Sequence, residues 1–139
     1  MKVKEAMAKT ISTASPQDPI RRVAQLMKQE GTGFMPVCEG NSIVGVITDR
    51  DIVIRGLAEG HDGVLNEPAS SFMTRGASTI SPDADLEEAA DIMNANEIRR
   101  LAVVDNGKLV GILSHGNLVQ AARSEGPADK ATLGVTRGA

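Results

Sequence analysis

Two short segments of this sequence carry residue types that could do chemistry. Thr48 and Asp51 stand three positions apart in the first segment, and Ser114 and Asn117 stand three positions apart in the second. On spacing alone, Thr48 and Asp51 are typical of a near relative of the capping box at the start of a helix. An ionised carboxylate accepts hydrogen bonds only, so Asp51 also matches the two hydroxyl donors of a ribose. Capping by Thr48 is compatible with that function, and the helix start beside Thr48 is a place for a first phosphate.

The second segment differs from the first at the acidic position. Asn117 stands where Asp51 stands, and an amide has one acceptor oxygen and no charge. The loss of one charge-assisted hydrogen bond costs about 1.5 to 3 kcal/mol, or one to two decades in affinity. We therefore expect the site at Ser114 and Asn117 to bind more weakly, to be empty, or to take another ligand.

The second copy, which lacks the acidic residue, carries positive charge that the first copy lacks at the matched positions. Arg99 and Arg100 precede the aliphatic run that ends at Val103. Their guanidinium groups are candidates for forked contacts with phosphate oxygens. The alternative is a solvated pair of arginines that favours the end of a preceding helix. Arg50 is kept as a further candidate ligand contact, although a surface salt bridge is its more usual role.

Aliphatic and small residues beside these segments are candidates for a pocket around a base. Ordinary core packing is the alternative for each of them, and backbone groups could bind the base without any side chain. Met is adaptable enough to lie against a purine face. The candidates are Ile11, Thr13, Met35 and Pro36 in the first half of the chain, and Thr79, Ile80, Leu101 and Ala102 in the second half.

The elements that must position these residues form an internal repeat. Residues 12–53 align with residues 78–119 at a constant offset of 66, without a gap, and Met7 and Met73 extend the match. Two copies are too few for a solenoid, so we expect two halves related by a pseudo-twofold axis. The duplicated setting favours ribose binding by Asp51 beyond what its spacing alone suggests.

Each copy is predicted to fold as strand, helix, strand, strand, helix, in the α+β class. A helix follows Pro19 and ends at Gly31, because apolar residues recur at helical spacing between them. Strands are predicted over 34–38 and 43–48, and Asn106-Gly107 predicts a tight hairpin in the second copy. A last helix follows Thr48 or Ser114. Its predicted inward residues are Ile52, Val53 and Leu57 in the first copy, and Leu118, Val119 and Ala122 in the second.

The repeat resembles a tandem pair of CBS motifs, named for cystathionine beta-synthase. The resemblance lies in residues 45–51, Gly-Val-Ile-Thr-Asp-Arg-Asp, and residues 111–117, Gly-Ile-Leu-Ser-His-Gly-Asn. It covers the chain to about residue 123 and implies a small stand-alone regulatory protein. Its divisions would be motif 1 over 1–60, a connector over 61–70, motif 2 over 71–123 and a mobile tail over 124–139.

The resemblance also implies a ligand and a partner. Such proteins bind AMP, ADP, ATP or S-adenosylmethionine, and sometimes NAD, as effectors in clefts between the motifs, without a permanent cofactor. The first copy would then supply the ribose acceptor and the second the phosphate donors. Family members commonly pair as homodimers, here through Ile52, Leu57, Leu118 and Ala121. The alternative is a non-catalytic docking or homodimerisation protein with vestigial clefts, and the regulated protein target is unknown.

Composition excludes several other functions. Fifteen Lys and Arg against eighteen Asp and Glu give a net charge of -3, which does not favour nucleic acid. The sequence shows no membrane-spanning run, no signal peptide and no phosphate loop, triad or metal-ligand cluster. Neither catalysis nor a metal is therefore expected. The single cysteine, Cys38, fits a reducing compartment and a cytoplasmic location.

Overall fold

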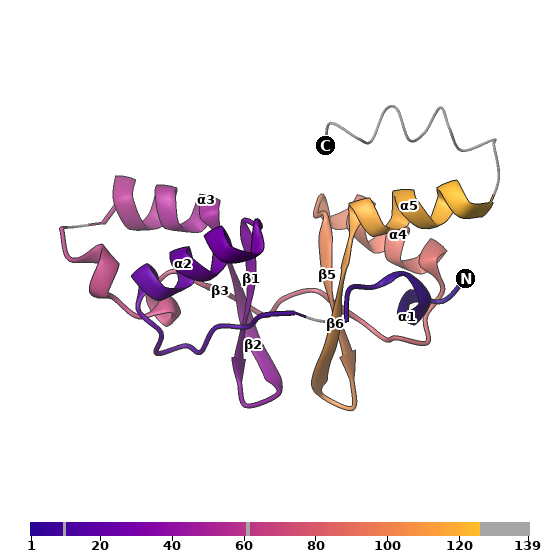
Figure 1. The fold of residues 1–139 in the computed structure, drawn as a ribbon, viewed down its shortest axis with the longest axis horizontal. Coiled ribbons are helices and arrows are strands. Elements are labelled where there is room, and N and C mark those ends of the chain that lie inside the picture. The colour runs from indigo at the N-terminus through magenta and orange to yellow at the C-terminus, as the bar shows by residue number, and fades with distance from the viewer. Residues whose placement is uncertain (10, 61, 126–139) are drawn as a thin grey trace. The chain divides into compact units, whose positions relative to one another are not determined.

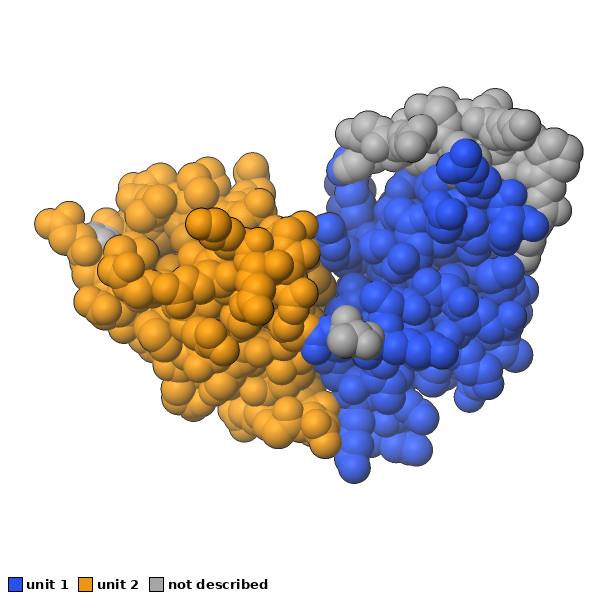
Figure 2. Space-filling model, viewed as in Figure 1, with its two compact units in different colours: residues 1–11, 78–139 blue, residues 12–77 orange. Residues whose placement is uncertain are grey.

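The chain folds into two compact units of mixed helix and strand. A computed structural model describes residues 1–9, 11–60 and 62–125, the side chain of Glu125 excepted. Unit 1 contains residues 1–11 and 78–139, and unit 2 contains residues 12–77 (Figure 2). Each unit has a sheet of three strands, with its helices on one side of the strands (Figure 1). The predicted α+β class is confirmed.

Unit 2 contains the first copy of the repeat. Its sheet has the order β1-β2-β3, and both pairs of strands are antiparallel. Gly31 ends helix α2 in the left-handed region at φ 65°, which glycine adopts without strain. The predicted helix and the strands predicted over 34–38 and 43–48 are confirmed, whereas the strand predicted before the helix is only a single bridge between Ala14 and Val37. The elements are α2 (Ile20–Glu30), β1 (Phe34–Glu39), β2 (Ser42–Thr48), α3 (Asp49–Asp51), the π-helix η1 (Ile52–Ala58), the 3-10 helices η2 (Val64–Asn66) and η3 (Ala69–Ser71), and β3 (Thr74–Arg75).

Unit 1 contains the second copy. Strand β4 pairs with β5 in parallel, and β5 pairs with β6 through the hairpin that Asn106 and Gly107 predict. Both turn residues have positive φ, 52° and 80°, as a two-residue turn of this type requires. The elements are α1 (Val3–Ala6), β4 (Thr79–Ile80), α4 (Leu86–Asn96), β5 (Arg100–Asp105), β6 (Lys108–Ser114) and α5 (His115–Glu125).

The N-terminal segment packs on the second copy of the repeat. Val3 is fully buried in the core of unit 1, and its amide donates to the Ala84 carbonyl at 2.9 Å. In unit 2 the amide of Ala69 donates to the Asp18 carbonyl at 2.8 Å, which is the same bond displaced by 66 residues. The predicted divisions at residues 60 and 70 follow the order of the chain. Packing instead places residues 1–11 with the second copy and the residues up to 77 with the first copy. Ser124 still belongs to α5, and the rest of the predicted tail, 126–139, lies outside the described residues.

The prediction that Val53 and Leu57 face inward is wrong. Their side chains are 51% and 60% exposed, whereas Ile52 is partly buried against the core of unit 2. The reason is the π-helix η1, whose i→i+5 bonding departs from the 3.6-residue period on which the prediction relied. In unit 1, α5 is a regular α-helix, and Leu118, Val119 and Ala122 are half-buried.

Candidate functional site

Thr48 and Asp51 exchange two hydrogen bonds at the end of β2. The Thr48 amide donates to Asp51 Oδ2 at 3.0 Å, and the Asp51 amide donates to Thr48 Oγ1 at 3.1 Å. This is the reciprocal capping box that the spacing predicts, with Thr48 in the extended conformation before the first helical turn. The capping role is therefore confirmed, and it uses one of the two carboxylate oxygens of Asp51.

The sheet holds Thr48 at a fixed place. Thr48 lies opposite Phe34 in the β1–β2 ladder, and the next amide, that of Asp49, donates to the Gly33 carbonyl at 2.9 Å. Strand pairing therefore continues into the first residue of the helix. This continuity fixes the direction in which the Asp51 carboxylate leaves the helix start.

Asp51 keeps acceptor capacity that the cap does not use. Its side chain is half-buried, and no described residue forms an ion pair with it. Among the described residues, none donates a hydrogen bond to its Oδ1 atom. A carboxylate with a free oxygen beside a helix start can accept hydroxyl donors from a ligand.

Ser114 and Asn117 form the same frame in unit 1. The Ser114 amide donates to Asn117 Oδ1 at 2.9 Å, and the Asn117 amide donates to Ser114 Oγ at 3.0 Å. Here the cap takes the single amide oxygen, and the other end of the side chain is an NH₂ donor. The two frames thus match in backbone geometry and differ in charge and in what remains for a ligand.

Arg99 and Arg100 lie next to the frame of unit 1. Arg100 is opposite Ser114 in the β5–β6 ladder, and the Arg99 carbonyl accepts from the His115 amide at 2.7 Å. Both arginine side chains are exposed. Unit 1 therefore carries two cations beside its helix start. In unit 2, Arg50 is exposed between two acidic residues.

The base-pocket candidates divide into buried and exposed residues. Met35, Ile80 and Leu101 are at most 5% exposed within the cores of their own units, so core packing accounts for them. Direct contact of these three side chains with a ligand is not supported. Pro36 and Ala102 are buried as well. Thr13 and Thr79 are exposed, Ile11 is half-buried, and the carbonyl of Pro36 accepts from the Ala14 amide at 2.9 Å.

Gly33 and Asp49 form a contact that sequence reasoning missed. A Cβ atom on Gly33 would clash with the Asp49 carboxylate, so this carboxylate covers the glycine. The equivalent residues of unit 1, 66 positions on, are Arg99 and His115. The signal was present in the repeat alignment, where a glycine stands opposite an arginine. The contact places an acidic group in unit 2 where unit 1 has a basic one.

Other classes of site find little support in the described part of the chain. Residues 1–9, 11–60 and 62–125 contain no group of three or more His, Cys, Asp or Glu side chains that could hold a metal ion. No described helix is long and apolar enough to cross a membrane. Cys38 is buried, and burial raises the pKa of its thiol, which lowers the fraction of reactive thiolate.

Comparison with known proteins agrees with the duplicated fold. The relative "CBS domain-containing protein YhcV" of Bacillus subtilis is 37% identical over 134 residues, which cover 96% of this chain and 94% of the relative. Two solved structures superpose with high similarity. The crystal structure of CBSX2 in complex with AMP has a TM-score of 0.78 and 27% identity, and covers 89% of this chain and 97% of its own. That of Hypoxic Response Protein I with two coordinated zinc ions has a TM-score of 0.79 and 26% identity, over 86% and 98%.

The sequence also matches one protein family in both copies of the repeat. The CBS domain is matched at residues 3–57 and again at residues 69–124. The matched ranges contain Thr48 and Asp51 in one domain and Ser114 and Asn117 in the other. The family model matches both halves of the chain, the relative from Bacillus subtilis is similar over nearly the whole length, and both solved structures have the same fold. This chain therefore belongs to the CBS domain family.

Proposed function

We propose that this CBS pair is a regulatory module that binds an adenosine-containing ligand, namely AMP, ADP, ATP or S-adenosylmethionine, and does not catalyse a reaction. The observation that carries the proposal is Asp51, whose Oδ2 atom serves the helix cap while its Oδ1 atom has no donor among the described residues. A vicinal diol supplies two hydroxyl donors, and a half-buried carboxylate is the acceptor that fits them. The ribose is therefore assigned to Asp51.

We propose a separate phosphate-binding site within unit 1, formed by its own basic side chains. Arg99 and Arg100 are exposed at the start of β5, and a guanidinium group can bind two phosphate oxygens in a forked geometry. Ser114 and Asn117 lie at the helix start beside these two arginines, where they can contact a ligand of unit 1 that binds more weakly than the one at Asp51. Because AMP is bound in the related CBSX2 structure, an adenine nucleotide is the first ligand to test.

Calorimetric titration of AMP, ADP, ATP and S-adenosylmethionine tests the proposal. At about 0.3 kcal/mol per heavy atom, a ligand of roughly 23 heavy atoms has a Kd on the order of 10 µM. The decisive variant is Asp51→Asn. Asn117 shows that an amide completes the same cap, so this variant removes the charge and keeps the fold. We expect affinity to fall by about 10- to 100-fold with an unchanged melting temperature.

The control for this titration is Lys108→Ala, which removes an exposed cation in the β5–β6 turn that belongs to neither candidate site. Its side chain has no hydrogen bond or ion pair with a described residue, so its effect on ligand affinity is expected to be small. Equal binding by the wild-type protein and Asp51→Asn would show that the ribose is not held by Asp51. Absence of binding by all four ligands would favour the second candidate, a non-catalytic docking protein.

A homodimer is part of the proposal. Of the four residues predicted to pair the chains, Ile52 and Leu118 pack against the cores of their own units and Ala121 is buried, whereas Leu57 is exposed. Leu57 leaves apolar surface exposed on unit 2 together with Val53, Ile54 and Leu65, and covering such surface is favourable. Sedimentation recorded by interference optics tests this, because the chain has no Trp or Tyr for detection at 280 nm. Leu57→Glu is expected to shift the protein toward monomer. We also assign the protein to the cytoplasm, where a lone buried cysteine such as Cys38 stays reduced.

A further inference from the structure

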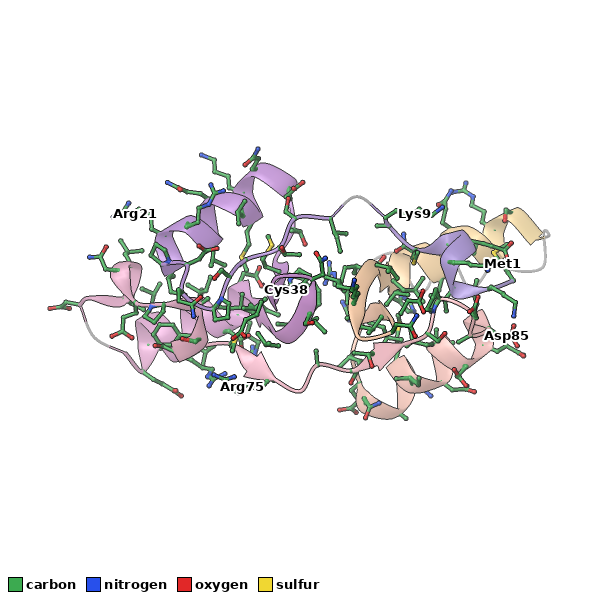
Figure 3. The ribbon with its side chains drawn as sticks, turned by 90° about the horizontal axis from the view of Figure 1, so that it is seen from below. Met1, Lys9, Arg21, Cys38, Arg75 and Asp85 are labelled. Atoms are coloured by element: carbon green, nitrogen blue, oxygen red, sulfur yellow. The ribbon has the colours of Figure 1, made fainter. Side chains whose placement is uncertain are left out.

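The methionine side chains of this protein differ in how far they reach solvent. Four of the six are at most 7% exposed and lie in the cores of their own units, namely Met27, Met35, Met73 and Met93. Met1, labelled in Figure 3, is 45% exposed and packs on neither core. Met7 is half-buried and packs against the core of unit 1. Met7 is therefore the methionine that solvent reaches and that also takes part in core packing.

The Met7 sulfur lies directly on Gly111 in β6. A Cβ atom added to Gly111 would lie 2.6 Å from Met7 Sδ and 3.1 Å from its Cγ atom, so no further heavy atom fits between the two residues. The matched contact in unit 2 joins Met73 to Gly45, where an added Cβ would lie 3.2 Å from the Met73 sulfur. Met73 is 4% exposed. The two contacts are alike, and the access of solvent to them is not.

Met7 also lies between the two places where residues 1–9 attach to unit 1. On one side of Met7, Val3 is buried in the core of unit 1. On the other side, Ala8 exchanges two backbone hydrogen bonds with Ile112, at 2.9 and 3.0 Å. The chain continues into unit 2 at residue 12, so non-covalent contacts hold this segment on the rest of unit 1.

We propose that Met7 is a site of reversible oxidation to methionine sulfoxide, and that the sulfoxide releases residues 1–9 from unit 1. The oxidant is hydrogen peroxide. The sulfur lone pair attacks one peroxide oxygen, the S–O bond forms as the O–O bond breaks, and the departing oxygen takes the proton of the transferred one and leaves as water. The thioether is thereby oxidised by two electrons and the peroxide is reduced. A methionine sulfoxide reductase reverses the step, since two thiols become a disulfide while the oxygen leaves as water.

A sulfoxide does not fit the place that the thioether occupies. Its oxygen is polar, and burying it against Gly111 and the apolar core without a donor is unfavourable. Turning the oxygen toward water moves the sulfur away from the glycine. Either arrangement removes the packing of Met7, and a segment held by non-covalent contacts can then open locally while unit 2 stays folded. This modification goes beyond ligand binding and does not depend on Asp51.

Peptide mass spectrometry after treatment with hydrogen peroxide tests the site. The protein carries Cys38→Val, so that no thiol competes for the oxidant. Trypsin separates Met7, Met73 and Met93 into the peptides 5–9, 56–75 and 76–99. We expect Met7 to gain oxygen about tenfold faster than Met73 or Met93, because a buried methionine reacts only when its core opens. Equal rates for Met7 and Met73 would overturn the assignment.

Deuterium exchange tests the release. After oxidation, the amides of Val3 and Ala8 are expected to exchange about tenfold faster or more, and to recover after treatment with the reductase. Met7→Leu keeps an apolar side chain of similar volume without a sulfur, so peroxide should leave its residues 1–9 unchanged. Met73→Leu is the matched control and should still show the release. Met7→Gln, a polar side chain of similar length, should exchange rapidly without peroxide.

Each outcome decides one part of the proposal. Sulfoxide at Met7 with unchanged exchange of residues 1–9 would overturn the release, and so would slow exchange in a folded Met7→Gln variant. Release by peroxide in Met7→Leu would show that Met7 is not its cause. None of these measurements contains an adenosine ligand, so their failure is distinct from a failure of the proposed function.

Discussion

The two helix starts of this CBS pair have the same hydrogen bonds and different charge. In unit 2 the cap consists of Thr48 and Asp51, and in unit 1 of Ser114 and Asn117, with all four donor–acceptor distances between 2.9 and 3.1 Å. Unit 2 covers Gly33 with the Asp49 carboxylate, whereas unit 1 has Arg99 and His115 at the matched positions. The backbone frame is thus repeated, and the electrostatic environment is not.

This difference separates capping from ligand binding. A cap needs one acceptor oxygen, and Asn117 shows that an amide provides it as well as a carboxylate does. The negative charge of Asp51 is therefore not required by the helix start. A residue that exceeds the structural requirement at an otherwise repeated position is a candidate for function, and variants of the two units can test this reasoning.

The largest effect is expected from a substitution that disrupts the sheet of unit 2. A Cβ atom on Gly45, in β2, would lie 2.6 Å from the Thr74 carbonyl oxygen of β3. Gly45→Ala must therefore displace a paired backbone, and we expect a loss of about 1–3 kcal/mol in the free energy of unfolding. Gly111→Ala should cost less, because its nearest contact is the flexible Met7 side chain at 2.6 Å, although the Ala8 carbonyl oxygen at 2.8 Å still restricts it.

Urea unfolding followed by far-UV circular dichroism measures both losses. Gly116→Ala is the control, because its Cβ would meet only Ser114 Oγ at an ordinary 3.5 Å. In a helix this change is expected to stabilise the protein by about 0.4–1 kcal/mol. If Gly45→Ala were as stable as the wild type, the close approach of β3 to β2 would not constrain this position.

The next largest effect is expected from a substitution that gives both helix starts the same charge. Asn117→Asp gives unit 1 the carboxylate of unit 2 with the same cap, so the helix start is expected to remain intact. Under the proposed function, the affinity of unit 1 for an adenosine ligand rises by about tenfold, since one charge-assisted hydrogen bond is gained. Calorimetry should then record a stronger second binding event. An unchanged titration would indicate that Asn117 is outside any ligand site.

Much of the fold follows from local sequence, and the parts that do not have identifiable causes. The hairpin at Asn106 and Gly107 and the end of α2 at Gly31 depend on residues that tolerate positive φ, which a single sequence shows directly. The capping box at Thr48 depends on a three-residue spacing. The π-helix could not be predicted from a 3.6-residue period, because the apolar residues alone do not reveal a change in winding.

The cap beside the candidate site was predictable, but its surroundings were not. Spacing predicted the pairing of Thr48 with Asp51, whereas the lack of a donor to Asp51 Oδ1 among the described residues depends on where neighbouring groups lie in space. The burial of Met35 and Leu101 likewise depends on segments distant in sequence. The packing of Val3 on the second copy could not be predicted either. The repeat alignment does not show whether the N-terminal segment packs on the first copy or on the second.

A smaller effect tests the helix that follows the unit 2 cap. Arg55 Nη1 donates to the Phe72 carbonyl at 2.9 Å and thereby joins η1 to the segment that leads into β3. Its match in unit 1 is Ala121, which makes no such bond. Arg55→Ala is expected to reduce the free energy of unfolding by about 1 kcal/mol, with Arg50→Ala near zero. Equal urea midpoints for the two variants would contradict a structural role for Arg55.

The smallest effect concerns Cys38, whose match in unit 1 is Val104. Burial raises the pKa of the Cys38 thiol in the folded chain, so the folded state holds this proton more tightly than the unfolded state. The resulting stability is present below the pKa of the unfolded thiol, about 8.5, and is lost as pH rises through the folded-state pKa. Cys38→Val removes the titrating group and gives unit 2 the residue of unit 1.

Urea midpoints of the wild type and Cys38→Val between pH 7.5 and about 10 isolate this thiol, because all other titrating groups are common to both proteins. We expect the difference between them to be constant up to about pH 8.5 and then to move in favour of Cys38→Val. A difference that stays constant over the whole range would mean that the thiol reaches solvent as freely in the folded chain as in the unfolded one. The β1 bulge at Val37 and Cys38 would then have to open in the native state.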